Sequence, residues 1–445
     1  MSAGPEPGVA TGRHPGAPAG RRTLARGGLL LAPSAGLAHG LHYAYNVAMA
    51  AVLGPAAFGA LGALLALILL GSVPGIALQA VAARHTALLA HQGAGQRALW
   101  RSLVRLAAWW GAGLAAATVA VGPTLAAWLH LDSPAPVLLL AVALAPSTFS
   151  YASQGMLQGR EAFGGFAAVA LVNAVGKLAA GLALVAAGLG VSGAVAGAAA
   201  GTALAAAAGV LLVRRALAAA GAAPTPPAAR EAAARTREAV AATTGLLGLF
   251  LLTNLDVPLA RHFLPAEASG LYALGAVVAK VAFWGPQFVT TLVFARLVTG
   301  ADRRRLLAGS AALIVGSGAL LAAGLAALAP LGVALPLLGR DYAAIGPALP
   351  LFAALGCSLA LVQLLLFEEI AASARRMGRV LALAAVLQAV LISVAFHHSV
   401  AQIVGTALAV ALVLVAAGAV LAARRVGPLT ARPRAGNGTP APPAI

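Results

Sequence analysis

The sequence is poor in charged residues, in aromatic residues and in cysteine. Only 9% of its 445 residues are charged and 5% are aromatic, and Cys357 is its one cysteine. A water-soluble domain carries about a quarter charged residues, so this composition excludes a large soluble domain. A single cysteine also excludes an internal disulfide and a cysteine-based metal cluster.

Apolar residues make up 61% of the chain and stand in long runs. About 20 apolar residues in a helix span a bilayer, so the runs predict an all-α membrane protein. Breaks at glycine, proline and charged residues divide them into twelve candidate transmembrane helices. The predicted ranges are 27–53, 57–83, 103–129, 134–157, 164–188, 190–213, 241–262, 269–295, 306–337, 345–370, 376–396 and 400–423.

One long polar break, at 214–240, divides the twelve helices into two bundles of six. It holds three prolines and five arginines and predicts a cytoplasmic linker. The Gly-, Pro- and Arg-rich start of the chain predicts a disordered arm. A signal peptide is the competing interpretation, which the uninterrupted apolar run that follows disfavours. The predicted domains are a disordered cytoplasmic arm at 1–26, an amino-terminal lobe at 27–213, the linker at 214–240, a carboxy-terminal lobe at 241–423 and a disordered cytoplasmic tail at 424–445.

The formal net charge is +18, but the basic residues are spread in small groups between the apolar runs. This distribution argues against nucleic acid as a partner, which would require one basic patch. With the amino terminus inside, 25 of the 29 lysines and arginines fall on the cytoplasmic side, in line with the positive-inside rule. The chain is therefore predicted to be a multi-pass protein of the plasma (inner) membrane with both termini cytoplasmic.

The two halves share a spaced pattern that predicts a duplication. Equivalent positions are separated by 210 to 212 residues, and six spans precede the second copy, so the repeat is parallel, with a pseudo-two-fold axis along the membrane normal. Two similar bundles around a central cavity suit alternating access. The alternative is an ancestral duplication in a protein that does not transport. The pattern is Asn46, Pro55, Gly59, Pro74 and Arg84 in the first half, and Asp256, Pro265, Gly270, Pro286 and Arg296 in the second.

Two prolines of this repeat, Pro74 and Pro286, stand inside predicted helices. A proline there removes a backbone hydrogen bond and clashes with the preceding turn. Both are candidate hinges, and a static bend is the alternative interpretation.

Three ionisable residues stand deep in predicted spans, namely Lys177, Asp256 and Lys280. Ionised side chains are costly in a bilayer, so these residues require a partner or an aqueous cavity. Two lysines against one aspartate favour an anion, and a phosphate or pyrophosphate group suits the point charge of lysine. Helical spacing adds polar neighbours on the same faces. The predicted substrate-binding residues are Lys177, Lys280, Asn173, Trp284, Gln287 and Asn46.

Asp256, preceded by Asn254, has two interpretations that the sequence leaves open. It is either a site for a coupling cation or proton, or a structural partner of Lys280. His39 and His42 lie three residues apart on one helix face and are candidates for proton uptake, with an interhelical hydrogen bond as the alternative. No metal site and no cofactor are predicted, because no carboxylate or cysteine stands near the histidines.

The predicted outer connections, such as 130–134, 189–191 and 397–402, are only a few residues long. A membrane glycosyltransferase or glycan polymerase requires larger outer loops with acidic catalytic residues, whereas Asp132 and Asp341 stand alone. The chain is therefore predicted not to be an enzyme. Its four methionines and few aromatics also argue against an adaptable site for varied drugs.

Three stretches, at 53–70, 151–201 and 255–297, carry the patterns LGP..FG, LQG, K...G..L, G..G and D..LA...L in order. In these the chain resembles the polysaccharide and oligosaccharide-lipid flippases of the multidrug/oligosaccharidyl-lipid/polysaccharide exporter superfamily. The resemblance implies twelve helices in two lobes, with Lys177, Asp256 and Lys280 lining the cavity.

The resemblance also implies an activity. The expected function is movement of an isoprenyl-pyrophosphate-linked oligosaccharide or polysaccharide precursor from the inner to the outer leaflet. A gradient of H⁺ or Na⁺ is the expected driving force, and membrane lipid and glycan-assembly enzymes are the expected partners. The alternative is an ion-coupled antiporter of drugs or other small molecules with the same fold.

Overall fold

The computed structural model describes residues 19–89, 93–218, 229–285, 303–328, 340–371 and 377–425, and their regular secondary structure is helical. The first half holds α1 (Ala19–Gly71), α2 (Val73–Leu88), α3 (Gly93–Trp128), α4 (Ala135–Gly159), α5 (Phe163–Leu184), the π-helical turn η1 (Val185–Leu189) and α6 (Gly190–Ala218). The second half holds α7 (Ala229–Asn254), α8 (Asp256–Phe263), α9 (Ala266–Trp284), α11 (Arg303–Leu328), the 3-10 helix η2 (Arg340–Ala348), α12 (Leu349–Ala371), α13 (Met377–Val394) and α14 (Val400–Arg425).

The described residues form an all-helical membrane protein, as predicted. Eight of their helical stretches are long and apolar enough to cross a membrane, or nine if the bent pair α7 and α8 counts as one span. Each predicted span overlaps one of these helices or the shorter α13. Two of the eight stretches double back on themselves, at the turns described next, and the total of twelve spans stays a prediction.

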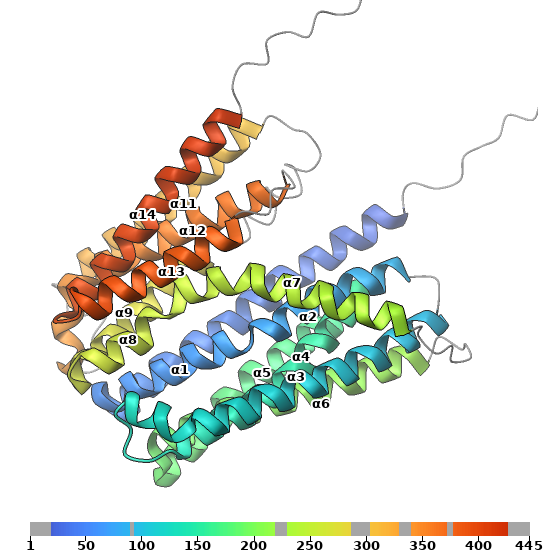
Figure 1. Cartoon of the computed structure of the whole chain (residues 1–445), viewed down its shortest axis with the longest axis horizontal. Coiled ribbons are helices and arrows are strands. Elements are labelled where there is room, and N and C mark those ends of the chain that lie inside the picture. Colours follow the sequence, from blue (N-terminus) through green and yellow to red (C-terminus); the bar gives the residue numbers. More distant parts are fainter. Residues whose placement is uncertain are drawn as a thin grey trace, which may run out of the picture.

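The two arms of α1 meet at Gly54. Its φ and ψ angles, 73° and 171°, belong to a region that is open almost only to glycine, so the helix is interrupted there. Pro55 follows, and its fixed φ suits the first turn of the next helix. The chain reverses at this turn, and the second arm and α2 run back beside the first arm (Figure 1).

The first arm of α1 packs antiparallel to α9. The ring of His39 stacks on that of Trp284 with the centroids 5.9 Å apart, and the Tyr43 hydroxyl donates a 3.1 Å hydrogen bond to the carbonyl of Lys280. A later residue of the arm thus meets an earlier residue of α9. This contact joins the two halves of the chain next to Lys280, which is one of the predicted substrate-binding residues.

The second arm of α1 packs parallel to α9 on small residues. A Cβ atom on Gly59 would lie 2.8 Å from the backbone nitrogen of Gly270, and one on Gly62 would lie 2.7 Å from the Cβ of Ala273. Both pairs are 211 residues apart, which is the offset of the predicted repeat. Residues at equivalent places in the two halves therefore face each other, as a pseudo-two-fold axis between these helices requires.

α5 and α6 form an antiparallel hairpin. Gly188 and Gly190 in its turn have φ angles of 87° and 50°, which favour glycine. Along the hairpin, Gly181 contacts Gly197, and a Cβ on Gly201 would lie 2.6 Å from the backbone nitrogen of Lys177. The close approach of the two backbones holds Lys177 within the first group of helices.

Figure 1 shows two groups of helices that meet at one end and diverge toward the other. α3 to α6 belong to one group, and α11 to α14 belong to the other, with α1, α2, α7 and α9 making the contacts between the groups. We call the two ends of the molecule the closed end and the open end. The α3–α4, α8–α9 and α13–α14 turns lie at the closed end, and α1 begins and α14 ends at the open end (Figure 1).

Arg261 of α8 fastens the closed end. Its guanidinium is 8% exposed and donates to three carbonyl oxygens of the first half, those of Leu129 (2.9 Å), His130 (3.1 Å) and Ala56 (3.2 Å). It also donates to the hydroxyl of Ser269 at 3.2 Å. Burying a charged group is costly unless its hydrogen-bond donors have acceptors. The guanidinium has these acceptors, and its hydrogen bonds link the two groups of helices.

Stacked rings continue this contact beside Arg261. The ring of His262 lies between those of Trp128 and His130, with centroid separations of 4.5 Å and 5.4 Å. Its Nδ1 lies 2.8 Å from the carbonyl oxygen of Trp128. On the far side Phe263 packs against His397 at 4.7 Å, so α8 is held by rings from both groups.

Four predicted domain boundaries fall within helices, and the division into these domains stays a prediction. The predicted arm 1–26 overlaps α1, which begins at Ala19, because no proline follows Pro18 before the apolar run and the helix extends outward. The predicted linker 214–240 overlaps the end of α6 and the start of α7. Alanine- and arginine-rich segments on both sides of the prolines have high helix propensity and continue the helices beyond the apolar runs. The predicted tail begins two residues inside α14, which ends at Arg425.

Candidate functional site

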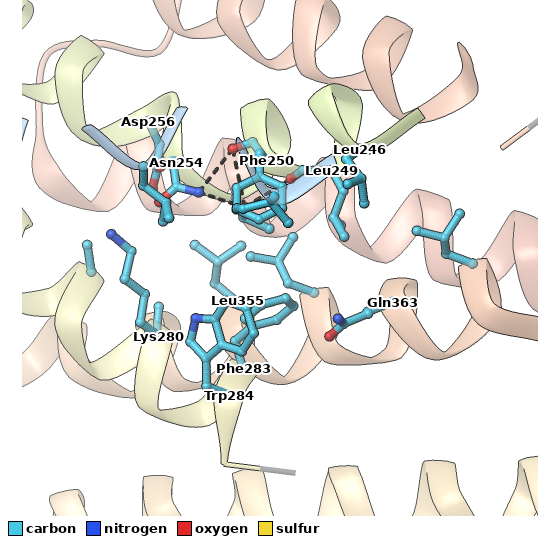
Figure 2. Close-up of a pocket in the computed structure, with 17 residues that line it drawn as sticks. Leu246, Leu249, Phe250, Asn254, Asp256, Lys280, Phe283, Trp284, Leu355 and Gln363 are labelled. Carbon is cyan, nitrogen blue, oxygen red and sulfur yellow. Dashed lines mark hydrogen bonds between the residues drawn. The ribbon is translucent and has the colours of Figure 1, made fainter. Parts of the chain in front are cut away.

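A cavity of about 220 Å³ is lined mainly by the second half of the chain and is bordered on the first half by Leu69 and Ile76. Its walls come from α1, α2, α7, α8, α9 and α12, and most of the lining side chains are leucine, isoleucine or phenylalanine. Figure 2 shows that Asn254, Asp256 and Lys280 lie at one part of this apolar space, and that Gln363 lies apart from them. The polar lining residues are Thr253, Asn254, Asp256, Lys280 and Gln363.

Asp256 lies where the helix breaks between α7 and α8, which are bent by 42°. Pro258 explains the break, because a proline has no N–H and its ring clashes with the carbonyl four residues earlier, that of Asn254. The bend brings Asp256 into the first turn of α8. Anionic side chains are favoured in that turn by the helix dipole.

The carboxylate of Asp256 is buried, with 5% of the residue exposed. One oxygen, Oδ2, accepts a 2.6 Å hydrogen bond from the hydroxyl of Tyr272 on α9. The other, Oδ1, has no hydrogen-bond partner, and neither has Oδ1 of Asn254. Two buried acceptor oxygens without donors are costly, which indicates that they serve a ligand or ion.

Lys280 extends from α9 into the cavity, and its ammonium group points toward Asn254 and Asp256 (Figure 2). The lysine and the aspartate interact electrostatically, but no direct ion pair joins them. The predicted structural pair is therefore not closed in this conformation. Trp284, one turn after Lys280, also lines the cavity and stacks on His39.

Lys177 lies outside the cavity lining. Its Nζ sits 4.1 Å from the centroid of the Tyr45 ring, in a cation–π contact. Tyr45 is itself fixed, because its hydroxyl donates a 2.7 Å hydrogen bond to the carbonyl of Ala194. Lys177 and Lys280, which belong to different halves of the chain, are near enough to interact electrostatically.

The remaining predicted residues are dispersed. Asn46 donates its amide to the carbonyl of His42, four residues earlier on its own helix, at 2.8 Å. His42 and Asn173 are half-buried and are not among the residues that line the cavity. Pro74 is in the first turn of α2, just after the boundary at Ser72, and its role as a hinge stays a prediction. Gln287 and Pro286 lie outside the described residues.

Two polar residues near this site were not predicted. Tyr272 stands eight residues before Lys280, two helical turns away on the same face of α9, and this spacing was a usable signal. Gln388 is 1% exposed, and neither its amide oxygen nor its nitrogen has a partner. A single amide in the middle of the mainly apolar α13 was the available signal.

The packing of α13 against α7 brings Gln388 to the level of Asp256. Gly245 meets Gly378, and Gly248 meets the backbone around Ala382, so the two helices run parallel with an offset of 133 to 134 residues. With the same offset, Asn254 of α7 corresponds in height to residues 387 and 388 of α13. Unpartnered side-chain atoms of Asn254, Asp256 and Gln388 therefore occur at one height of the helix bundle.

No protein-family profile matches the sequence, and no curated protein is significantly similar to it. Solved structures do share its architecture. The lipid II flippase MurJ, in an inward closed conformation, has a TM-score of 0.69 and 11% identity over 89% of this chain and 87% of that chain. The MATE multidrug transporter DinF-BH has a TM-score of 0.62 and 12% identity over 91% of this chain and 96% of that chain.

A multidrug resistance transporter of the MATE family, in the inward-facing conformation, matches with a TM-score of 0.61 and 13% identity over 87% of this chain and 96% of that chain. All three match over nearly their whole lengths. The chain has the fold of the multidrug/oligosaccharidyl-lipid/polysaccharide (MOP) exporter superfamily. The narrower resemblance to polysaccharide flippases stays a prediction.

Proposed function

We propose that this MOP-fold protein is a flippase for an isoprenyl-pyrophosphate-linked oligosaccharide or polysaccharide precursor. The observation that carries the proposal is the ammonium group of Lys280, which points into an interlobe cavity without a direct ion pair. A cation held there without a closed ion pair is available to a pyrophosphate group. The apolar walls suit the part of the lipid next to the headgroup.

The balance of charge supports an anionic substrate. Lys177 and Lys280 are the two lysines near the cavity, and Asp256 is the acidic residue that lines it. The lysines belong to different halves, so an anion between them is bound by both. The lipid tail remains in the bilayer while rocking of the lobes carries the headgroup and glycan across.

We infer the orientation from the arginines, with support from the comparisons. Exposed arginines of the first group, such as Arg84, Arg105 and Arg214, lie on the helix ends away from the closed end. We therefore assign the open end to the cytoplasm. An inward-facing MATE family structure matches with a TM-score of 0.61 and an outward-facing one with 0.55, which is in line with the same assignment. Substrate then enters from the inner leaflet.

The fold comparisons support a lipid-linked cargo among the substrates known for this architecture. MurJ, at a TM-score of 0.69, is described as a lipid II flippase. The MATE structures, which are described as multidrug transporters, match with scores of 0.61 and 0.62. A lipid-linked precursor is thus compatible with the MOP fold.

We propose that Asp256 and Asn254 take up the coupling ion, H⁺ or Na⁺, with Gln388 as a further member. All three carry buried atoms without hydrogen-bond partners. Binding of a cation at Asp256 weakens its attraction for Lys280, and this frees the lysine for the anionic headgroup. Binding of the cation and binding of the substrate are then coupled through the interaction between Asp256 and Lys280.

The direct test compares polyprenyl-pyrophosphate lipids, by mass spectrometry, in a strain that lacks this gene and in its parent. Accumulation of a completed lipid-linked oligosaccharide on the inner leaflet is the expected result. An unchanged lipid pool in a strain that normally expresses the gene contradicts the flippase proposal. Sensitivity to cationic drugs is then the next measurement, because the second candidate is an ion-coupled drug antiporter.

A variant test separates the two candidates. Replacing both lysines by glutamine, Lys177→Gln with Lys280→Gln, should abolish transport while the protein still inserts and folds. The matched control carries arginine at both positions and retains the charge, so it should keep part of the activity. Full activity of the glutamine variant contradicts an anionic substrate, and an essential Asp256 with dispensable lysines favours the drug antiporter.

A further inference from the structure

A second cavity, of about 380 Å³, opens on the outer wall of the helix bundle between α2, α3 and α7. It has no lining residue in common with the central cavity. Trp109 stands at its edge and is 78% exposed. We call this cavity the α3–α7 groove, and its lining residues are Pro74, Trp109, Trp110, Gly113, Leu114, Val240, Thr243 and Thr244.

On each of the two helices α3 and α7, an exposed arginine lies beyond the groove in the direction of the open end. On α3, Arg105 precedes Trp109 by four residues, which is one helical turn on the same face. On α7, Arg237 precedes Val240 by three residues and Thr244 by seven, which is again one face. Two cations thus stand at one end of a groove that is otherwise mostly apolar.

The nearby acidic residue does not neutralise these arginines. The carboxylate of Glu238 is engaged by Arg84 at 2.6 Å and by His85 at 2.9 Å. Neither Arg105 nor Arg237 forms an ion pair with another described residue. The end of the groove therefore carries a surplus of positive charge.

We propose that the α3–α7 groove binds an anionic phospholipid of the surrounding bilayer. The headgroup phosphate lies between Arg105 and Arg237, and an acyl chain follows Trp109, Leu114 and Val240 into the membrane. The arrangement matches an amphiphile, because the cations are at one end only and the tryptophan marks the interface between water and hydrocarbon. Zwitterionic lipids lack the net charge that the arginines require.

A bilayer lipid is the occupant, rather than the transported precursor, because the groove faces outward and is separate from the central cavity. The proposal does not rest on the transport function. It has a structural consequence, since the groove joins α2 and α3 of the first group to α7 of the second. A lipid bound there bridges helices from both halves of the chain.

The test uses full-length protein in nanodiscs that contain equal amounts of phosphatidylglycerol and phosphatidylcholine, followed by native mass spectrometry of the lipids retained on release. Wild-type protein should retain phosphatidylglycerol in preference to phosphatidylcholine. In the double variant Arg105→Gln with Arg237→Gln this preference should fall about tenfold. Trp109→Ala leaves the two arginines in place, and it should lower the retention of phosphatidylglycerol.

The matched control is Arg214→Gln with Arg215→Gln, which removes the same charge from two exposed arginines of α6, a helix that contributes no residue to the groove. It should leave the preference unchanged. An equal loss in this control, or an unaltered preference in the Arg105 and Arg237 variant, overturns the proposal. The experiment measures bound lipid and not transport, so its result does not depend on whether the flippase proposal holds.

Discussion

Gly59 and Gly270 stand at equivalent places in the two halves of the chain and pack against each other where the halves meet. The contact leaves no room for a side chain, since a Cβ on Gly59 would lie 2.8 Å from the nitrogen of Gly270. Here the predicted repeat, which was a pattern of spacings in the sequence, corresponds to a physical contact. The closeness of the two backbones makes this contact sensitive to a single methyl group.

Gly59→Ala should therefore destabilise the protein by about 1–3 kcal/mol, because the added Cβ forces α1 and α9 apart. Gly40→Ala is the matched control on the same helix, where nothing lies within 4 Å of the new Cβ. The control should be neutral or slightly stabilising, since alanine favours a helix. Unfolding in mixed detergent measures both, and equal stability of the two variants would contradict the close contact.

Tyr272→Phe should lower the free energy of unfolding by about 1–3 kcal/mol. The substitution removes the 2.6 Å hydrogen bond to Asp256 and leaves both carboxylate oxygens without a donor. In a double-mutant cycle with Asp256→Leu, the cost of Tyr272→Phe should largely disappear, because the acceptor is gone. Additive costs in this cycle would show that the hydrogen bond contributes little.

Arg261→Met should loosen the closed end, because the arginine donates to the carbonyls of Leu129, His130 and Ala56. Hydrogen–deuterium exchange of a peptide covering 128–134 should become faster, and Arg261→Lys should give an intermediate rate, since lysine lacks the planar fork. Arg97→Met is the control, because Arg97 donates to the carbonyl of Leu217, which belongs to another contact. Unchanged hydrogen–deuterium exchange in Arg261→Met would contradict the role of Arg261 in stabilising the closed end.

Gln388→Leu should raise the free energy of unfolding by about 1–2 kcal/mol while reducing ion-driven transport. Both amide atoms are buried without a partner, so an apolar side chain of similar size removes a desolvation cost. Gln402→Leu on α14, where the exposed glutamine accepts a 3.0 Å hydrogen bond from the N–H of His398, should not raise the free energy of unfolding and should leave ion-driven transport unchanged. A Gln388→Leu variant that transports normally at every ion concentration would remove Gln388 from the proposed coupling site.

The helices were predictable because each span is encoded locally, as a run of apolar residues bounded by glycine, proline or charge. The stripe that joins Lys280 to Trp284 was predictable for the same reason. Lys177 was expected in the cavity and lies on Tyr45 instead, because the direction of a long side chain depends on which ring packs beside it. Gln388 was missed since its meaning depends on the pairing of α13 with α7, which no local pattern reports.

The hydrogen bonds from Arg261 to the first half of the chain all go to main-chain oxygens, and the glycines beside it make contact through the backbone. Every amino acid offers the same carbonyl, so the side chains at 56, 129 and 130 do not decide whether these hydrogen bonds can form. These hydrogen bonds therefore constrain the path of the backbone far more than they constrain residue identity.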